Sequence, residues 1–157
     1  MKLYHGTNVE FDEIDLRQSN KYKDFGQGFY LTDIRSQAIE LAQKRAVRDG
    51  GYPVLQEYEF DENYLADQNL KVLRFEHPTK EWAEFIYKNR SRKISFTHDY
   101  DIVFGPIADD GVAYLLDRYE EGSFSLEELA RELEYKDLNS QFFFGTKKAI
   151  SLLKRVK

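Results

Sequence analysis

The sequence of 157 residues contains no cysteine, and that absence excludes several classes of site. Without thiols there is no disulfide framework, no thiolate nucleophile and no zinc–thiolate centre. Histidine is scarce too, because only His5, His77 and His98 occur, and a three-histidine metal site would need all of them. We therefore expect no metal site.

Long apolar segments are also missing. No stretch approaches the roughly 18 consecutive apolar residues of a membrane-spanning helix. The N-terminus reads MKLYHGTN and lacks the apolar stretch of a secretory leader. From these absences we expect a cytoplasmic protein that does not associate with a membrane.

The composition is otherwise that of a globular protein, with many aromatic rings. Hydrophobic residues make up 41% and charged residues 32%, and there are 12 Phe and 11 Tyr. A chain of this length usually organises one core, so we predict a single domain over residues 1–157. The formal net charge of −5 excludes a uniformly basic nucleic-acid-binding coat.

Charges of each sign are grouped along the chain. Residues 99–137 hold 12 acidic and 3 basic side chains, whereas residues 71–93 hold 7 basic and 3 acidic ones. One interpretation is a solvated mosaic of surface charge. The other is a basic face that attracts an anionic ligand, such as a dinucleotide pyrophosphate or a nucleic acid.

Hydrophobic patterning predicts strands and helices without regular alternation, which is typical of the α+β class. Short apolar or alternating runs predict strands at 1–5, 29–32, 54–60, 70–75, 101–105 and 141–144. Helical spacing predicts helices at 34–48, 78–89, 109–120, 125–134 and from Thr146 to about Val156, and residues 9–28 are expected to form a long loop. Predicted N-caps are Asp33, Thr146 and Ser125, the last with Glu128 at capping-box spacing.

Three short strings combine residue types that could carry chemistry. Residues 4–7, Tyr-His-Gly-Thr, put an imidazole beside a glycine whose backbone a planar ligand could approach closely. Residues 25–32 contain Gly-x-Gly before an aromatic strand, in which Tyr30 could stack on a heteroaromatic ring while Phe29 faces the other way. Residues 139–144 lead from polar side chains into an aromatic strand. Taken singly, each string is also compatible with ordinary turn and core packing.

Together, and in this order, the strings resemble the motifs of the diphtheria-toxin-like and poly-ADP-ribose-polymerase-like ADP-ribosyltransferases, a clade named for a His, a Tyr and a Glu. The clade's Tyr-His-Gly-Thr and Gly-Phe-Tyr-x-Thr-Asp strings match residues 4–7 and 28–33. The sequence is also similar to a group of small bacterial domains of this type, through strings at 4–7, 24–32, 99–110 and 141–144.

This resemblance implies a split β-sheet that binds NAD in a bent pose, with no metal. His5 would bond a ribose hydroxyl, the Gly6 backbone would pair with the nicotinamide amide, and Tyr30 would stack on the nicotinamide ring. Thr7, Gly28 and Phe29 would complete the cofactor-binding set. The implied reaction is mono-ADP-ribosylation of a protein or nucleic acid, and a toxin of this kind would have an antitoxin as a partner.

The sequence departs from the clade at the third motif, where Gln141 stands in place of the expected glutamate. Glutamine can hydrogen-bond a hydroxyl but supplies no charge. Asp101, Asp109 and Asp110 are candidate replacement carboxylates, although Asp109 could simply cap a helix. Lys23 and Arg35 flank the second motif and could meet the pyrophosphate or be plain surface.

Three functions stay open at this point. The first is an NAD-dependent mono-ADP-ribosyltransferase with catalytic residues His5, Tyr30 and Gln141. The second is a module that binds NAD, ADP-ribose or a nucleic acid without turnover, which would explain Gln141. The third is a partner-binding protein that docks through the acidic helices of residues 99–137.

Overall fold

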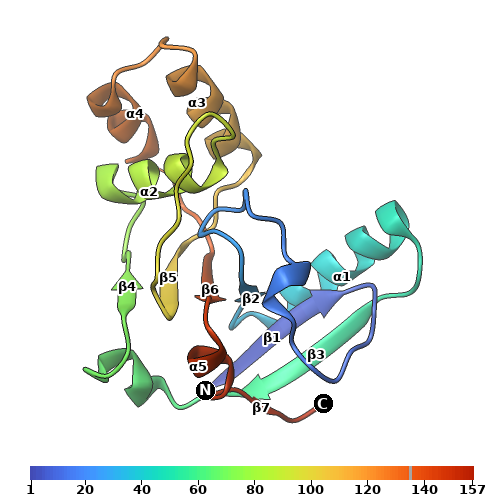
Figure 1. The fold of residues 1–157 in the computed structure, drawn as a ribbon. Helices are drawn as coiled ribbons and strands as arrows, with labels where there is room; N and C mark the ends of the chain where they lie inside the picture. Colours follow the sequence, from blue (N-terminus) through green and yellow to red (C-terminus); the bar gives the residue numbers. More distant parts are fainter. Residues whose placement is uncertain (135) are drawn as a thin grey trace.

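The fold is an α+β arrangement of seven strands and five α-helices in the residues described by a computed structural model, 1–134 and 136–157 (Figure 1). The strands are β1 (Lys2–Thr7), β2 (Phe29–Leu31), β3 (Val54–Glu59), β4 (Val72–Arg74), β5 (Ile102–Pro106), β6 (Ser140–Phe144) and β7 (Lys154–Arg155). The α-helices are α1 (Arg35–Asp49), α2 (Lys80–Arg90), α3 (Asp110–Glu120), α4 (Leu126–Leu133) and α5 (Lys147–Ile150). Short 3₁₀ turns occupy Leu16–Gln18 and Glu62–Ala66.

The strands form two sheets rather than one. The first sheet has the order β1-β3-β7 and is antiparallel, and the second has the order β2-β6-β5-β4, in which only β4 and β5 run parallel. The two sheets touch at a single antiparallel bridge between Tyr4 and Thr32. The split between β1 and β2 is therefore a gap in what would otherwise be one continuous surface.

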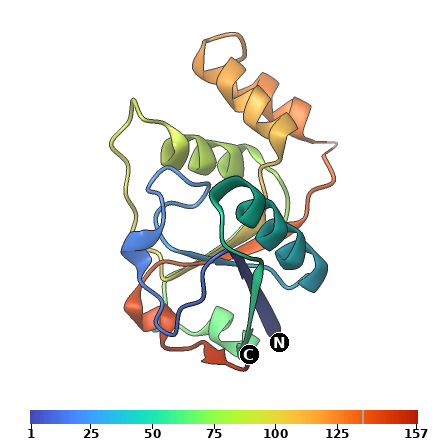
Figure 2. The same cartoon turned by 90° about the vertical axis from the view of Figure 1, so that its right-hand side faces the viewer.

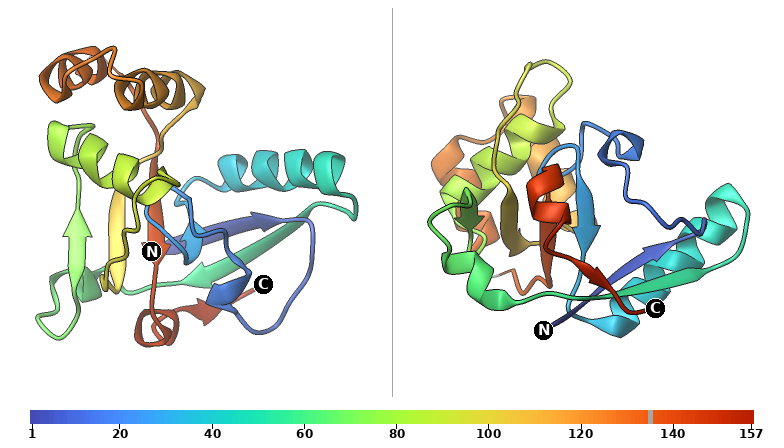
Figure 3. Two further views of the ribbon diagram at one scale, coloured as in Figure 1. Left: turned by 45° about the horizontal axis from the view of Figure 1, so that its top comes forward. Right: turned by 60° about the horizontal axis from the view of Figure 1, so that its bottom comes forward.

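Helices cover the two sheets separately. α1 runs alongside β1 and β3, whereas α2, α3 and α4 gather at the far end of the larger sheet (Figures 1 and 3). Trp82 of α2 is fully buried there, and its indole Nε1 donates a 3.0 Å hydrogen bond to the Pro106 carbonyl. Leu129 and Leu133 of α4 are also fully buried in this cluster, so the protein's own core uses the apolar face of α4.

Most predicted elements are present close to their predicted positions. The alternation at 54–60 gives β3, and Gln56, Tyr58 and Phe60 are buried on one face. The alternation also predicts a solvent face, but Glu57 on that face is buried too, and its carboxylate pairs with Lys2 at 3.0 Å. The capping box at Ser125 and Glu128 forms, because each residue's side chain accepts from the other's backbone N–H. The β1 strand is longer than predicted, since it continues through Gly6 to Thr7.

Two local predictions are wrong. Asp33 does not cap α1; the N-cap is Ile34, whose N–H donates to the Thr32 hydroxyl at 3.0 Å. The predicted final helix ends at Ile150, although its Thr146 cap is correct. The chain then turns into β7, where Arg155 pairs with Tyr58 of β3 and its side chain reaches Glu10. Long-range pairing at this end outweighs the local helical pattern.

Both chain ends lie at the first sheet, in which β1 and β7 flank β3 (Figure 2). The amino group of Met1 donates a 2.8 Å hydrogen bond to the Phe60 carbonyl. No helix in the described part of the chain has the length and apolarity needed to cross a bilayer.

Candidate functional site

The site begins where β1 and β2 separate. Tyr4 and Thr32 exchange two backbone hydrogen bonds of 2.7 and 2.9 Å, after which the strands diverge. The next ladder pair would be Gly6 and Tyr30, but the Tyr30 carbonyl instead lies 2.7 Å from Nδ1 of His5. The His5 side chain thus bridges the split.

The backbone of Gly6 faces this opening. Alternate residues of a strand direct their N–H and C=O groups to the same edge, so Gly6 shares the edge that Tyr4 directs toward Thr32. No second pair forms there, which leaves polar groups that a ligand can bond. The glycine is required on its other side: a Cβ at Gly6 would lie 2.0 Å from the Ala38 carbonyl oxygen of α1. Helix packing, rather than ligand approach, is therefore what demands glycine.

The His5 ring is neutral. Burial is the main cause that lowers its pKa to about 4, and the positive charges of Arg45 and Lys23 add to it. Because a carbonyl oxygen only accepts, the proton sits on Nδ1 and points to Tyr30. The remaining nitrogen, Nε2, therefore offers a lone pair suited to a ligand hydroxyl.

The Tyr30 ring is held rigidly. Its hydroxyl donates to the Gly26 carbonyl at 2.6 Å and accepts from the Phe25 N–H at 3.0 Å. Burial raises the pKa of this phenol well above its usual value, so it stays protonated. Phe25 and Phe143 pack against the ring, while the ammonium of Lys23 lies 4.8 Å from its centroid. One aromatic face is thus anchored and already attracts a cation.

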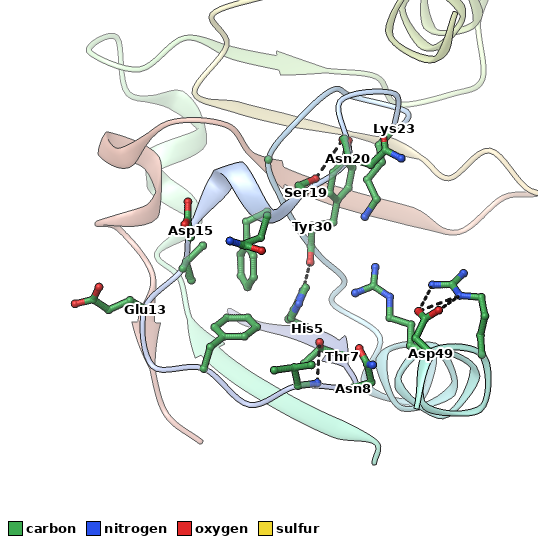
Figure 4. Close-up of a pocket in the computed structure, with 18 residues that line it drawn as sticks. His5, Thr7, Asn8, Glu13, Asp15, Ser19, Asn20, Lys23, Tyr30 and Asp49 are labelled. Atoms are coloured by element: carbon green, nitrogen blue, oxygen red, sulfur yellow. Dashed lines mark hydrogen bonds and ion pairs between the residues drawn. The ribbon is translucent and has the colours of Figure 1, made fainter. Parts of the chain in front are cut away.

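A cavity of about 540 Å³, here called the main cavity, gathers these groups. Of the residues predicted to bind a cofactor, His5, Thr7, Gly28, Phe29 and Tyr30 line it. The 9–28 loop forms one wall and the C-terminal half of α1 another. In Figure 4, the side chains of His5 and Lys23 point toward a common space, the Tyr30 ring extends from it toward Asn20, and the carboxylate of Glu13 points away from it. Its volume is in the ordinary range for small-ligand sites, about 300–1,000 Å³.

Phe29 and Gly28 have packing roles as well. The Phe29 ring lies on the opposite side of β2 from Tyr30, as predicted, and its centroid is 4.2 Å from that of His5. A Cβ at Gly28 would lie 2.2 Å from the Phe143 ring, so only glycine lets β2 approach β6 here.

A second, smaller hollow of about 250 Å³, here called the side hollow, shares Tyr30 with the main cavity. Gly6 and Gln141 both line it, together with Leu41 of α1. The structure therefore distributes the predicted residues over two adjoining spaces, with Tyr30 common to both. Gln141 lies on β6 opposite Gly105, and its amide Nε2 donates to Oδ2 of Asp24 at 3.2 Å.

Unneutralised positive charge lies in the main cavity. Burial lowers the pKa of Lys23 to about 8 and lowers that of Arg45 as well. The negative charge of Asp24 acts on Lys23 and that of Asp49 acts on Arg45, but these carboxylates form their ion pairs with Arg90 and Arg48. Two partly buried cations without a carboxylate partner form a site suited to an anion. Arg35, the other candidate from the sequence, is exposed and lines neither space.

The basic segment 71–93 has a different role. Its cations are mostly taken up in surface ion pairs, which favours the interpretation of a solvated mosaic for this stretch. The pairs are Lys71–Asp99, Arg74–Glu76, Lys80–Glu127, Lys88–Glu84, Arg90–Asp24 and Lys93–Glu120.

The three aspartates considered as substitutes for a glutamate are placed away from both spaces. Asp101 is buried and structural, accepting from the Lys71 N–H at 2.9 Å and from the Thr146 hydroxyl at 2.6 Å. Asp109 is the N-cap of α3, with its Oδ1 2.8 Å from the Val112 nitrogen, and Asp110 is the first residue of that helix. Within residues 1–134 and 136–157, no group of three or more His, Asp or Glu side chains could hold a metal ion.

Two functional candidates were missed from the sequence, namely Arg45 and Asp24. Arg45 could have been found, because Ala38 and Ala42 pack α1 against Gly6 and residue 45 continues the same helical face. Asp24 opens the string at 24–32 that carries part of the resemblance, but the sequence does not show its role, since its contacts with Arg90, Ala108 and Gln141 join segments that are far apart in the sequence.

Comparison with known proteins places the chain in one family. A family model described as "Protein of unknown function (DUF3990)" matches residues 1–155. No curated protein matches the sequence, and no solved structure matches it either. Because the family model spans nearly the whole sequence, the chain belongs to the DUF3990 family.

Proposed function

We propose that this protein binds NAD and transfers its ADP-ribose to a macromolecular acceptor, releasing nicotinamide. The observation that carries the proposal is the convergence in one cavity of a neutral His5, an anchored Tyr30 ring and the cations Lys23 and Arg45. NAD would use all three features. A ribose hydroxyl would donate to His5, the nicotinamide ring would stack on Tyr30, and the pyrophosphate would meet the two cations.

The two adjoining spaces suggest how NAD would be divided between them. The side hollow offers the free backbone edge of Gly6, the Tyr30 ring and the amide of Gln141, which suit nicotinamide and its ribose. The main cavity offers Lys23 and Arg45, which suit the pyrophosphate. Lys23 lies 4.8 Å from the Tyr30 ring centroid but lines only the main cavity, so it would meet the phosphates there while nicotinamide occupies the side hollow.

The reaction requires stabilisation of positive charge more than acid–base chemistry. The bond between C1′ of the ribose and the nicotinamide nitrogen breaks, and its electron pair leaves with neutral nicotinamide. The acceptor nucleophile then bonds C1′, and its proton passes to water. Positive charge develops on the sugar between these events, and preoriented dipoles and aromatic faces in a desolvated site stabilise it.

A second candidate is a module that binds NAD or ADP-ribose without turnover. Gln141 favours it, because an amide gives a neutral hydrogen bond where the clade has a carboxylate, and charge-assisted bonds are about twice as strong. Both candidates require the same ligand, and turnover separates them.

The test uses NAD labelled in its adenylate phosphate, incubated with purified protein and with cell lysate. We expect nicotinamide in the medium and label on an acceptor, and loss of both in His5→Ala and Tyr30→Ala. Tyr114→Ala is the matched control, because Tyr114 is 57% exposed on α3 and lines neither space. Binding of NAD with no nicotinamide after hours would favour the non-catalytic module. Turnover that His5→Ala leaves unchanged would refute the proposed site.

A further inference from the structure

Gln141 is not a free amide at the edge of the side hollow, because the partly buried carboxylate of Asp24 accepts a hydrogen bond from it. The Asp24 side chain is 12% exposed and uses both its oxygens. Oδ1 accepts from Arg90 at 3.0 Å, and Oδ2 accepts from the Ala108 N–H at 3.1 Å and from the Gln141 amide at 3.2 Å. Asp24 thus links the second motif to the strand that carries the third.

This contact fixes which way the amide points. A carboxylate only accepts hydrogen bonds, so the nitrogen of the Gln141 amide must face Asp24. The carbonyl oxygen, Oε1, is then directed away from Asp24, and no side chain or backbone group of the described residues bonds it. Gln141 lines the side hollow beside Tyr30, so this oxygen is an acceptor available to a ligand hydroxyl there.

The contact also places negative charge one hydrogen bond behind that oxygen. A donor bonded to an ionised group is polarised, which increases the partial negative charge on the far side of the amide. Arg90 offsets part of the Asp24 charge, but its guanidinium bonds the other oxygen, Oδ1, and not the one that faces Gln141.

We infer that Asp24 is the positioning residue of the third-motif site: it orients the Gln141 amide to accept a ribose hydroxyl, and the Asp24–Gln141 pair supplies the negative potential that a single glutamate supplies elsewhere in the clade. This inference rests on the proposed function and names a residue of the same site. The step it assists is the breaking of the C1′–nitrogen bond, in which the electron pair departs with nicotinamide. The acceptor nucleophile takes its place and loses its proton to water.

The test exchanges the two functional groups. We would measure NAD affinity and nicotinamide release for wild type, D24N, Q141E and the double variant D24N/Q141E. In D24N the charge behind the amide is lost, and we expect nicotinamide release to fall by about tenfold or more, as when one polar stabiliser of a site is removed. NAD affinity should change by less than about threefold, because ground-state contacts are kept.

In Q141E a new carboxylate faces Asp24 across a contact that is 3.2 Å in wild type, so the like charges repel and nicotinamide release falls. In the double variant the asparagine can donate to the new carboxylate, and release returns to the wild-type rate or above.

Two controls separate this role from simple folding effects. Arg90→Met removes the other side-chain partner of Asp24 and leaves Gln141 in place. We expect it to lower Tm while nicotinamide release stays near the wild-type rate. If D24N does not fold, the pH profile of Q141E alone is decisive. Its two facing carboxylates share protons, so its release should show an additional ionisation above pH 5, distinct from that of Lys23 at about 8, which wild type lacks.

The outcomes are distinct from those of the proposed function. Wild type that binds NAD and releases nicotinamide, with D24N equally active or with the double variant no better than D24N, would overturn the role of Asp24 alone. A Q141E profile identical in shape to that of wild type would also overturn it. Wild type that neither binds NAD nor releases nicotinamide would overturn the proposed function and this role together.

Discussion

Tyr30 has two proposed roles: its ring is the platform on which nicotinamide stacks, and its hydroxyl anchors the loop before β2. Substitutions that remove the hydroxyl alone, or the whole ring, separate these roles. Tyr30→Phe keeps the ring but removes the donor to the Gly26 carbonyl and the acceptor of the Phe25 N–H. Both partners belong to buried residues, and Phe25 is 0% exposed. An unsatisfied buried polar group costs about 1–3 kcal/mol, and two groups lose their partner, so we expect the free energy of unfolding to fall by about 2–6 kcal/mol.

That loss is large enough to measure by thermal unfolding. For a chain of this size each kcal/mol shifts Tm by about 2–4 °C, which gives a decrease of roughly 4–24 °C. NAD affinity, measured well below Tm, should stay within about threefold of wild type, because the stacking face is unchanged. Tyr30→Ala removes the face as well, and loss of a stacked heteroaromatic ring, about 1–3 kcal/mol, weakens Kd by roughly 5- to 150-fold.

Differential scanning calorimetry and NAD titration of wild type, Tyr30→Phe and Tyr30→Ala test both roles. An unchanged Tm in Tyr30→Phe would mean that the two hydrogen bonds do not hold the loop before β2. An NAD affinity as low in Tyr30→Phe as in Tyr30→Ala would mean that the hydroxyl itself contacts the ligand, and the platform account would be wrong.

Three further predictions concern charge and packing. Anion binding favours protonated Lys23, whose pKa is about 8, so NAD affinity should fall by up to roughly tenfold per pH unit as pH rises above 8; titrations from pH 6.5 to 9.5 should show this slope in wild type and not in Lys23→Met. His5 has a folded pKa of about 4 against 6.5 ordinarily, so the unfolded chain binds more protons between those values and stability falls as pH drops through that window, by up to about 3 kcal/mol. Urea unfolding at pH 7 and 4.5 should therefore show a smaller acid-induced loss in His5→Gln than in wild type, and equal losses would refute the buried neutral state. Gly6→Ala places a Cβ 2.0 Å from the Ala38 carbonyl oxygen and should destabilise the protein by about 3 kcal/mol or more, seen as a lower Tm, whereas an unchanged Tm would mean that α1 does not pack there.

Local patterns predicted the elements well wherever local chemistry decides the structure. The Ser125 capping box and the Thr146 cap both depend on neighbours within one element. Errors occur where a distant segment decides. Asp33 is a good cap by composition, but Thr32 is held by Tyr4 of β1 and its hydroxyl takes the Ile34 N–H instead.

The candidate site follows the same division. The sequence pointed to His5 and Tyr30, and the structure brings both to one cavity. It could not show that the His5 side chain replaces a ladder bond, nor that Gly6 is required by α1 rather than by a ligand. Asp24 and Arg45 were missed because their roles depend on the tertiary packing of a loop and a helix around the split.

The most direct test of the central claim is a calorimetric titration of NAD into wild type and Tyr30→Ala, with nicotinamide measured in the same tubes. The account predicts saturable binding and nicotinamide release by wild type, with both lost or strongly reduced in the variant. Absence of heat and of nicotinamide in wild type would contradict the account, because the cavity between β1, β2 and α1 would then not bind NAD.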